Sequence, residues 1–262
     1  MPPSADLGPL LRDRVAVVTG GSRGIGAGIA AALVAAGARV VISGRRGDVL
    51  ETTAAEIGAT PVVADATDRI SAGEPVRQAI ERFGGIDVLV NNVGGNAGGN
   101  PNLFAGEADE DDGFEANLRL NLTTAYWPTR PAVRSMRDRG HGRVINIGSG
   151  ASKHAAASPA YTAAKHGLIG LTKQLALDLA RHAITVNCVC PGWTNTDLVD
   201  FDVMAKAQGT SVDEARQRAE AESAQRRILE PSELGPMCVL LASDAGAPMT
   251  GQVIGVDGGY RL

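Results

Sequence analysis

Seven short apolar runs alternate with helical stretches along the chain, and this alternation constrains the fold more than any other feature. Unbroken apolar runs are typical of parallel strands that crossover helices bury on both faces. We therefore expect an α/β fold, a single-domain Rossmann-type doubly wound parallel sheet with helices on both faces. The expected strands lie near residues 14–19, 39–43, 60–64, 86–90, 143–148, 183–189 and 252–256. The expected helices lie near residues 25–36, 46–57, 68–82, 109–139, 158–181 and 231–242.

The turn after the first expected strand is rich in glycine. Residues 20–26 read Gly-Gly-Ser-Arg-Gly-Ile-Gly and lead directly into an Ala-rich helical segment. Strand, glycine turn and helix form the setting in which a backbone can approach a pyrophosphate closely and meet its charge with a helix N-terminus. The spacing is Gly-x-x-x-Gly-x-Gly, and an ordinary glycine-rich turn is the alternative. The residues expected to hold a dinucleotide here are Gly20, Ser22, Arg23, Gly24, Ile25 and Gly26.

Tyr161 and Lys165 are four residues apart in an expected helix, so both lie on one face. An ammonium near a phenol favours the phenolate, which suits proton transfer. Ser149 ends the apolar run 143–148 and can hydrogen-bond the substrate oxygen that the tyrosine protonates. Taken alone, most Tyr-x-x-x-Lys pairs are surface residues, and this pair gains weight only from the other motifs.

Composition excludes several classes of function. The 262 residues carry a net charge of −4 without a basic cluster, which argues against a nucleic-acid partner. No apolar run reaches the ~18 residues of a membrane span, and residues 1–10 lack the features of a signal peptide, so we expect a cytoplasmic protein. Cys188, Cys190 and Cys238 lack zinc-site spacing, and we expect no metal. We also expect Cys188 and Cys190 to point to opposite faces of their strand.

These motifs occur in the order and spacing of the short-chain dehydrogenase/reductase family, which the chain resembles from about residue 12 to its end. We therefore expect an N-terminal tail at 1–11 and one domain at 12–262, with a substrate lid near 197–228. Residues 164–167 and 184–192 are also similar to segments of 3-ketoacyl and aromatic-polyketide ketoreductases. The motifs are Thr19-Gly20-x-x-x-Gly24-x-Gly26, Asn91-Asn92-Val93-Gly94, Asn121, Ser149, Tyr161-x-x-x-Lys165 and Pro191-Gly192.

The resemblance implies hydride transfer between a nicotinamide and a carbonyl or secondary alcohol. Tyr161 would be the acid in reduction, and Ser149 would orient the oxygen. Lys165 would also bind the nicotinamide ribose. Asn121 would hold a water beside Lys165, with Asn117 as a rival for that role.

Two arginines indicate NADP(H), with NAD(H) as the alternative. NAD-preferring folds usually place an acid after the second strand, but here the chain continues Gly44-Arg45-Arg46 and has no acid before Asp48. The guanidiniums of Arg23 and Arg45 suit a 2′-phosphate. Alternatively, Arg45 and Arg46 are a solvated helix start, and Arg46 is the more surface-like of the two.

The family resemblance implies further cofactor contacts. Asp65 would meet the adenine amino group, or it would cap the next helix unless Asp68 does so. At Val93 the family usually has alanine, a departure that we expect only to shift packing. Trp193 is either a core aromatic or a wall of the site. The remaining implied contacts are Asp65, Ala66, Asn91, Val93, Gly94, Tyr161, Lys165, Pro191, Gly192, Thr194 and Thr196.

The leading interpretation is an NADP(H)-dependent oxidoreductase that reduces a small-molecule carbonyl, or catalyses the reverse reaction, on a 3-ketoacyl or polyketide substrate. The runner-up is a dehydrogenase of a sugar, a steroid or a hydroxy acid. A non-catalytic cofactor-binding regulator is disfavoured because Tyr161 and Lys165 are both present, and an epimerase would need a second domain. We expect a homotetramer built through helices 109–139 and 158–181 and the tail 256–262, and a mobile loop at 94–101.

Overall fold

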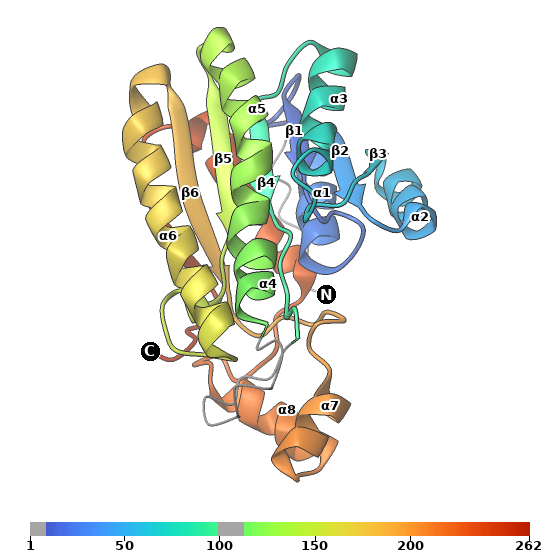
Figure 1. The fold of residues 1–262 in the computed structure, drawn as a ribbon, viewed down its shortest axis with the longest axis vertical. Helices are drawn as coiled ribbons and strands as arrows, with labels where there is room; N and C mark the ends of the chain where they lie inside the picture. The colour runs from blue at the N-terminus through green and yellow to red at the C-terminus, as the bar shows by residue number, and fades with distance from the viewer. Residues whose placement is uncertain (1–8, 99–112) are drawn as a thin grey trace.

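The computed structural model describes residues 9–98 and 113–262. Seven parallel strands form one sheet in the order β3-β2-β1-β4-β5-β6-β7 (Figure 1). The chain builds outward from β1 to β3, returns to β4 beside β1, and then builds outward in the other direction. The strands are β1 (Val15–Val18), β2 (Arg39–Gly44), β3 (Thr60–Val63), β4 (Val88–Asn91), β5 (Gly142–Ile147), β6 (Ile184–Pro191) and β7 (Val253–Val256).

Helices cover both faces of this sheet, which confirms the expected fold class. Those on one face are α1 (Gly24–Ala35), α2 (Gly47–Ile57) and α9 (Gly235–Ala242). Those on the other face are α3 (Glu74–Phe83), α5 (Thr124–Arg139) and α6 (Pro159–Leu179). Three further helices of the described residues lie beyond the carboxyl ends of the strands, and α7 and α8 lie together at the lower end of Figure 1. They are α4 (Phe114–Leu118), α7 (Phe201–Gln208) and α8 (Val212–Ala221).

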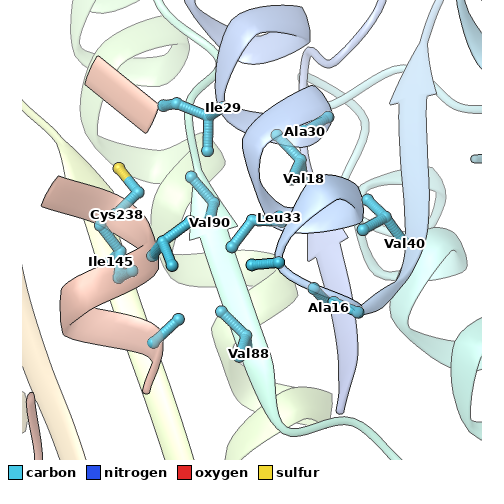
Figure 2. Close-up of a cluster of buried hydrophobic side chains, with 14 of the residues drawn as sticks. Ala16, Val18, Ile29, Ala30, Leu33, Val40, Val88, Val90, Ile145 and Cys238 are labelled. Atoms are coloured by element: carbon cyan, nitrogen blue, oxygen red, sulfur yellow. The ribbon is translucent and has the colours of Figure 1, made fainter. Parts of the chain in front are cut away.

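The larger apolar core lies between the sheet and α1 and α9. Ile29 and Leu33 of α1 are fully buried and pack over Val18, Val88 and neighbouring strand residues (Figure 2). Burying each such side chain contributes about 1.5–3 kcal/mol. This packing holds α1 across the sheet and so fixes the helix N-terminus at the end of β1.

The expected helix 109–139 is interrupted in its described part. It begins as α4, passes through a π-helical turn at Arg119–Thr123, and continues as α5. Residues 109–112, like residues 99–101 of the expected mobile loop, lie outside the described part. A π-turn adds a residue to the helical repeat and is common at functional sites. Here it carries Asn121, and nothing in the hydrophobic pattern pointed to it.

Two other expectations differ from the structure. Leu11, expected in the tail, is fully buried, and its N–H donates to Ala36 O at 2.8 Å. Cys188 and Cys190 do not face opposite sides of the sheet, because residues two apart on a strand share a face; their Sγ atoms lie 3.8 Å apart. Within the described residues, no helix is long and apolar enough to cross a membrane.

Candidate active site

A cavity of about 710 Å³ opens at the carboxyl ends of the strands, where the sheet order reverses between β1 and β4. Ligands of doubly wound sheets bind at this position. Most of the predicted site residues line it. They are Gly20, Ser22, Arg23, Gly24, Ile25, Gly26, Arg45, Asp65, Ala66, Val93, Gly94, Tyr161, Lys165 and Thr196.

The glycine turn forms one wall of the cavity. Gly20 and Gly24 adopt φ values of 65° and 53°, which favour glycine. A Cβ on Gly26 would meet Gly20 O and lie 2.5 Å from Asn92 Nδ2. No side chain caps the α1 N-terminus, so its N–H groups remain available to an anion in the cavity. This uncapped helix end and its close-packed turn fit a dinucleotide pyrophosphate.

Asn92 holds this turn, a role that we had not predicted. Its Nδ2 donates to Thr19 O at 3.1 Å and to Gly20 O at 3.0 Å, and its side chain lines the cavity. Asn91, expected as a cofactor contact, does not line the cavity. Its Nδ2 is buried and donates to Thr129 Oγ1 and Asn146 Oδ1. The Asn-Asn pair was visible in the sequence, but strand alternation alone did not show which member faces the ligand.

Tyr161 and Lys165 lie at the opposite end of the cavity. The Lys165 Nζ is 5.8 Å from the Tyr161 ring centroid and donates to Ile147 O at 3.0 Å. The Lys165 side chain is 3% exposed. Ser158 Oγ accepts the Tyr161 N–H at 3.2 Å and caps α6, which fixes the first turn that carries the tyrosine. The predicted pair is therefore held at the cavity by its helix cap and by β5.

Asn121 stands behind this end of the cavity. Its Oδ1 accepts the Gly95 N–H at 2.9 Å, and its Nδ2 donates to Gly95 O at 2.8 Å. A Cβ on Gly94 would lie 2.9 Å from Asn121 Oδ1 and 3.1 Å from Lys165 Nζ. Asn121 and Lys165 therefore converge on the backbone of Gly94, although Asn121 does not line the cavity itself.

Ser149 follows β5 but does not line the cavity, whereas Ile147 and Gly148 do. Its Oγ accepts the Ala151 N–H at 3.2 Å, and its own N–H donates to Ser152 Oγ at 3.1 Å. These bonds form a capping box on a short 3₁₀ turn and fix the orientation of the serine.

Only Thr196 of the predicted segment 191–196 lines the cavity. Thr194 is buried, and its hydroxyl donates to Gly192 O at 3.1 Å. A Cβ on Gly192 would lie 2.7 Å from Asp257 O, so this glycine packs against the C-terminal segment. Trp193 Nε1 donates to Glu222 Oε2 at 2.8 Å, beside the end of α8. Gly192 and Thr194 therefore pack within the protein rather than at the cavity, and Trp193 bonds to the residue that follows α8.

The end of the cavity beside β2 and the glycine turn carries three arginines, Arg23, Arg45 and Arg46, and is called the adenosine end after the part of the dinucleotide expected there. Arg45 and Arg46 both line it, and both residues are exposed. Arg23 Nη1 lies 2.6 Å from Asp197 Oδ2, an exposed ion pair that joins the glycine turn to the segment between β6 and α7. The sequence gave no sign that Asp197 would pair with Arg23. Both residues line the cavity.

Asp65 also lines this end, held in its own turn. Hydrogen bonds from the Thr67 hydroxyl and N–H, together with the charge of Arg45, lower the pKa of the Asp65 carboxyl. Asp68 Oδ1 accepts the N–H groups of Ile70 and Ser71 and so provides the cap for the following turn. The Asp65 carboxylate is therefore ionised and free of the capping role.

A second hollow of about 740 Å³ lies between α3 and α5, away from every predicted site residue. Five arginines line it, from segments far apart in the sequence: Arg69, Arg77, Arg130, Arg134 and Arg139. The fold thus gathers positive charge that the linear sequence does not show. The residues that line it include no glycine-rich turn and no tyrosine beside a lysine, so none of the predicted chemistry falls in this hollow.

Comparison with known proteins decides the family. The family model described as short chain dehydrogenase matches residues 14–206. The chain belongs to this family.

Three relatives show how far the similarity extends. D-beta-hydroxybutyrate dehydrogenase of Cupriavidus necator is 36% identical over 96% of this chain and 99% of its own length. Acetoacetyl-CoA reductase of Shinella zoogloeoides is 37% identical over 94% and 98%. The crystal structure of a single-residue variant of actinorhodin polyketide ketoreductase with NADPH superposes with a TM-score of 0.87 at 34% identity, covering 95% and 97%. This short-chain dehydrogenase is accordingly an oxidoreductase that acts on CH–OH and C=O groups of small molecules.

Proposed function

We propose that this short-chain dehydrogenase uses NADP(H) to interconvert a 3-ketoacyl group and the corresponding secondary alcohol. One observation carries the proposal: a single cavity joins the uncapped N-terminus of α1 to the Tyr161–Lys165 pair. The first feature suits a dinucleotide phosphate and the second suits proton transfer to a carbonyl oxygen.

The proposed chemistry divides between the cofactor and the chain. The bound cofactor supplies or accepts the hydride. The Tyr161 hydroxyl donates a proton to the oxygen of the carbonyl as it is reduced. The Lys165 ammonium has three hydrogens, of which Ile147 O takes one, leaving two for stabilising the phenolate and binding a ribose hydroxyl. Ser149 does not line the cavity itself but directly follows Ile147 and Gly148, which do, and its Oγ accepts from Ala151 N–H, so the proposal assigns its O–H as a donor to the substrate oxygen.

Three guanidiniums at the adenosine end support NADP(H) over NAD(H). Arg45 and Arg46 form no ion pair with any residue in the described ranges. Arg23 is paired with Asp197, but both side chains are more than half exposed. Such surface pairs are worth about 0–1 kcal/mol, so a 2′-phosphate can replace Asp197 at little cost. Arginine grips phosphate through two parallel hydrogen bonds.

The names of the relatives support the substrate class. Hydroxybutyrate, acetoacetyl-CoA and polyketide intermediates all carry oxygen at the third acyl carbon, and these are the compounds named for proteins 34–37% identical to this chain. Oxidation of a free 3-hydroxy acid is the second candidate, favoured by the match to hydroxybutyrate dehydrogenase over nearly the whole chain.

The test is the initial rate of NADPH oxidation with acetoacetyl-CoA, measured beside free acetoacetate, cyclic ketones and sugars. The proposal expects acetoacetyl-CoA to give the highest kcat/KM. Preference for free acetoacetate would favour the second candidate, and preference for a cyclic ketone or a sugar would contradict both.

We also propose that the protein is a homotetramer. Two of the long helices, α5 and α6, pack on the same face of the sheet. Tyr126 of α5 and Leu177 of α6 are exposed large hydrophobic residues, and Leu177 is 76% exposed. Leu262 at the C-terminus is fully exposed. Two such surfaces, each pairing with its symmetry copy, generate a tetramer with D₂ symmetry.

A further inference from the structure

Asn117 is a buried amide with no part in the proposed chemistry. It lies on α4, one turn before Asn121, and is 1% exposed. Its Oδ1 accepts the Ala97 N–H at 3.2 Å, and its Nδ2 donates to Gly98 O at 3.3 Å and to Gly113 O at 2.8 Å. Burying an amide is costly unless its hydrogen bonds are made, and this one makes two of its bonds to a single loop.

Side chains, rather than neighbouring backbone, satisfy the amides of this loop. The N–H of Gly95 bonds to Asn121, that of Ala97 to Asn117, and that of Gly98 to Asn96. Asn117 and Asn121 are four residues apart and therefore share a helix face. Together they hold alternate residues of the loop, as a neighbouring strand would.

The loop so held forms a wall at the reacting end of the cavity. Gly94, directly before this loop of residues 95–98, packs against Lys165 Nζ. At Gly95 a Cβ would lie 3.4 Å from Leu198 Cδ2, at the start of the lid. Gly94, Gly95 and Leu198 all line the cavity together with Tyr161. A shift of the loop would therefore change the space between the catalytic pair and the lid.

We propose that Asn117 is a positioning residue that sets the substrate wall of the site. The inference rests on the proposed function, because it assigns the wall to a carbonyl substrate. Asn117 acts through the loop at 95–98 and touches no reacting atom. A misplacement of about 1 Å at such a wall can cost ~100-fold in rate. The dinucleotide cradle of Gly20, Gly26 and Asn92 does not depend on it.

Two variants of Asn117 distinguish an effect on the loop from an effect on the stability of the fold. Asn117→Ala removes all three hydrogen bonds of the Asn117 side chain. Asn117→Thr keeps a local bond, because a threonine hydroxyl can donate to the carbonyl four residues earlier, as Thr124 does to Leu120 O at 2.7 Å. Asn187→Ala is the matched control: Asn187 is also 1% exposed and bonds backbone through both amide atoms, but between β6 and the residues before β7.

The measurements are kcat/KM for the best substrate, the NADPH Kd, and amide hydrogen exchange at Gly95 and Ala97. We expect both Asn117 variants to lower kcat/KM by about 10- to 100-fold, to keep the NADPH Kd within about threefold, and to speed exchange at Ala97. Asn187→Ala should lower the unfolding midpoint without these changes.

Two results would overturn the inference. One is an equal loss of kcat/KM in Asn117→Ala and Asn187→Ala, and the other is unchanged exchange at Ala97 in both Asn117 variants. If Asn117→Ala does not fold, Asn117→Thr alone decides. Exchange and NADPH binding need no turnover, so absence of ketoacyl activity in the unmodified protein would count against the proposed function and leave this test intact.

Discussion

Replacing Gly26 with alanine should damage the cofactor cradle more than the fold. The new Cβ would lie 2.5 Å from Asn92 Nδ2 and 2.9 Å from Gly20 C, and closer still to Gly20 O. Carbon contacts are favourable near 3.5–4.0 Å, so the turn must move by about 1 Å. The backbone of Gly20 cannot move away without changing its φ of 65°, which the turn requires.

The change in the free energy of unfolding caused by Gly26→Ala is the sum of opposing contributions. Overpacking of this kind costs about 1–3 kcal/mol. The lower chain entropy of alanine in a helix returns about 0.5–1 kcal/mol. Displacing Asn92 weakens its bonds to Thr19 O and Gly20 O, each worth about 0.5–1.5 kcal/mol. We expect a net loss of about 1–3 kcal/mol in stability and a rise of at least about tenfold in the NADPH Kd, since about 1.4 kcal/mol is tenfold.

Gly47→Ala is the control. Gly47 begins α2 next to the arginines of the adenosine end, and a Cβ there would meet only Val63 Cγ2 at an ordinary 3.5 Å. Fluorescence titration with NADPH and urea unfolding at fixed protein concentration compare the two variants. Gly47→Ala should keep its Kd within about twofold. A Gly26→Ala protein that binds NADPH and unfolds like the unmodified chain would refute the description of the cradle.

Three further predictions follow from the charges and surfaces. Arg45→Asp should lower kcat/KM for NADPH by about 10- to 100-fold and reverse the preference toward NADH, since a charged hydrogen bond is worth about 1.5–3 kcal/mol; equal wild-type kcat/KM for the two cofactors would contradict this. Burial and the nearby Arg143 and Arg14 lower the pKa of His141 below its usual 6.5, so the folded state resists protonation. The free energy of unfolding should therefore fall as pH drops below 6.5. In His141→Gln, the urea concentration at the unfolding midpoint should change less between about pH 7 and 5 than it does in the unmodified protein. Light scattering at micromolar concentration should give about 108 kDa, four chains of 26.9 kDa, whereas a mass near 54 kDa would leave only a dimer.

Much of this fold could be predicted because its signals are local. Each strand is an apolar run, and each helix begins or ends near glycine, proline or a capping side chain such as Ser158. The glycine turn and the Tyr161–Lys165 pair could also be recognised in the sequence, because each depends on residue spacing within a short segment. The seven-stranded parallel sheet confirms the expected fold class.

Features that depend on contacts between distant segments could not be predicted. Asp197 meets Arg23 across 174 residues, and Trp193 meets Glu222 across 29 residues. The sequence suggested Asn117 only as a rival for the role of Asn121, because both amides have the same chemistry. What distinguishes them is which loop residue each one bonds, and that follows only from the π-turn and the position of Gly95.

Turnover by Tyr161→Phe tests the central claim most directly. The substitution removes one hydroxyl, leaves Lys165 bonded to Ile147 O, and does not touch the glycine turn. On a confirmed substrate we expect kcat to fall by about 10²–10⁴-fold while the NADPH Kd stays within about threefold. A Tyr161→Phe protein that keeps more than about a tenth of the wild-type kcat would show that another group supplies the proton.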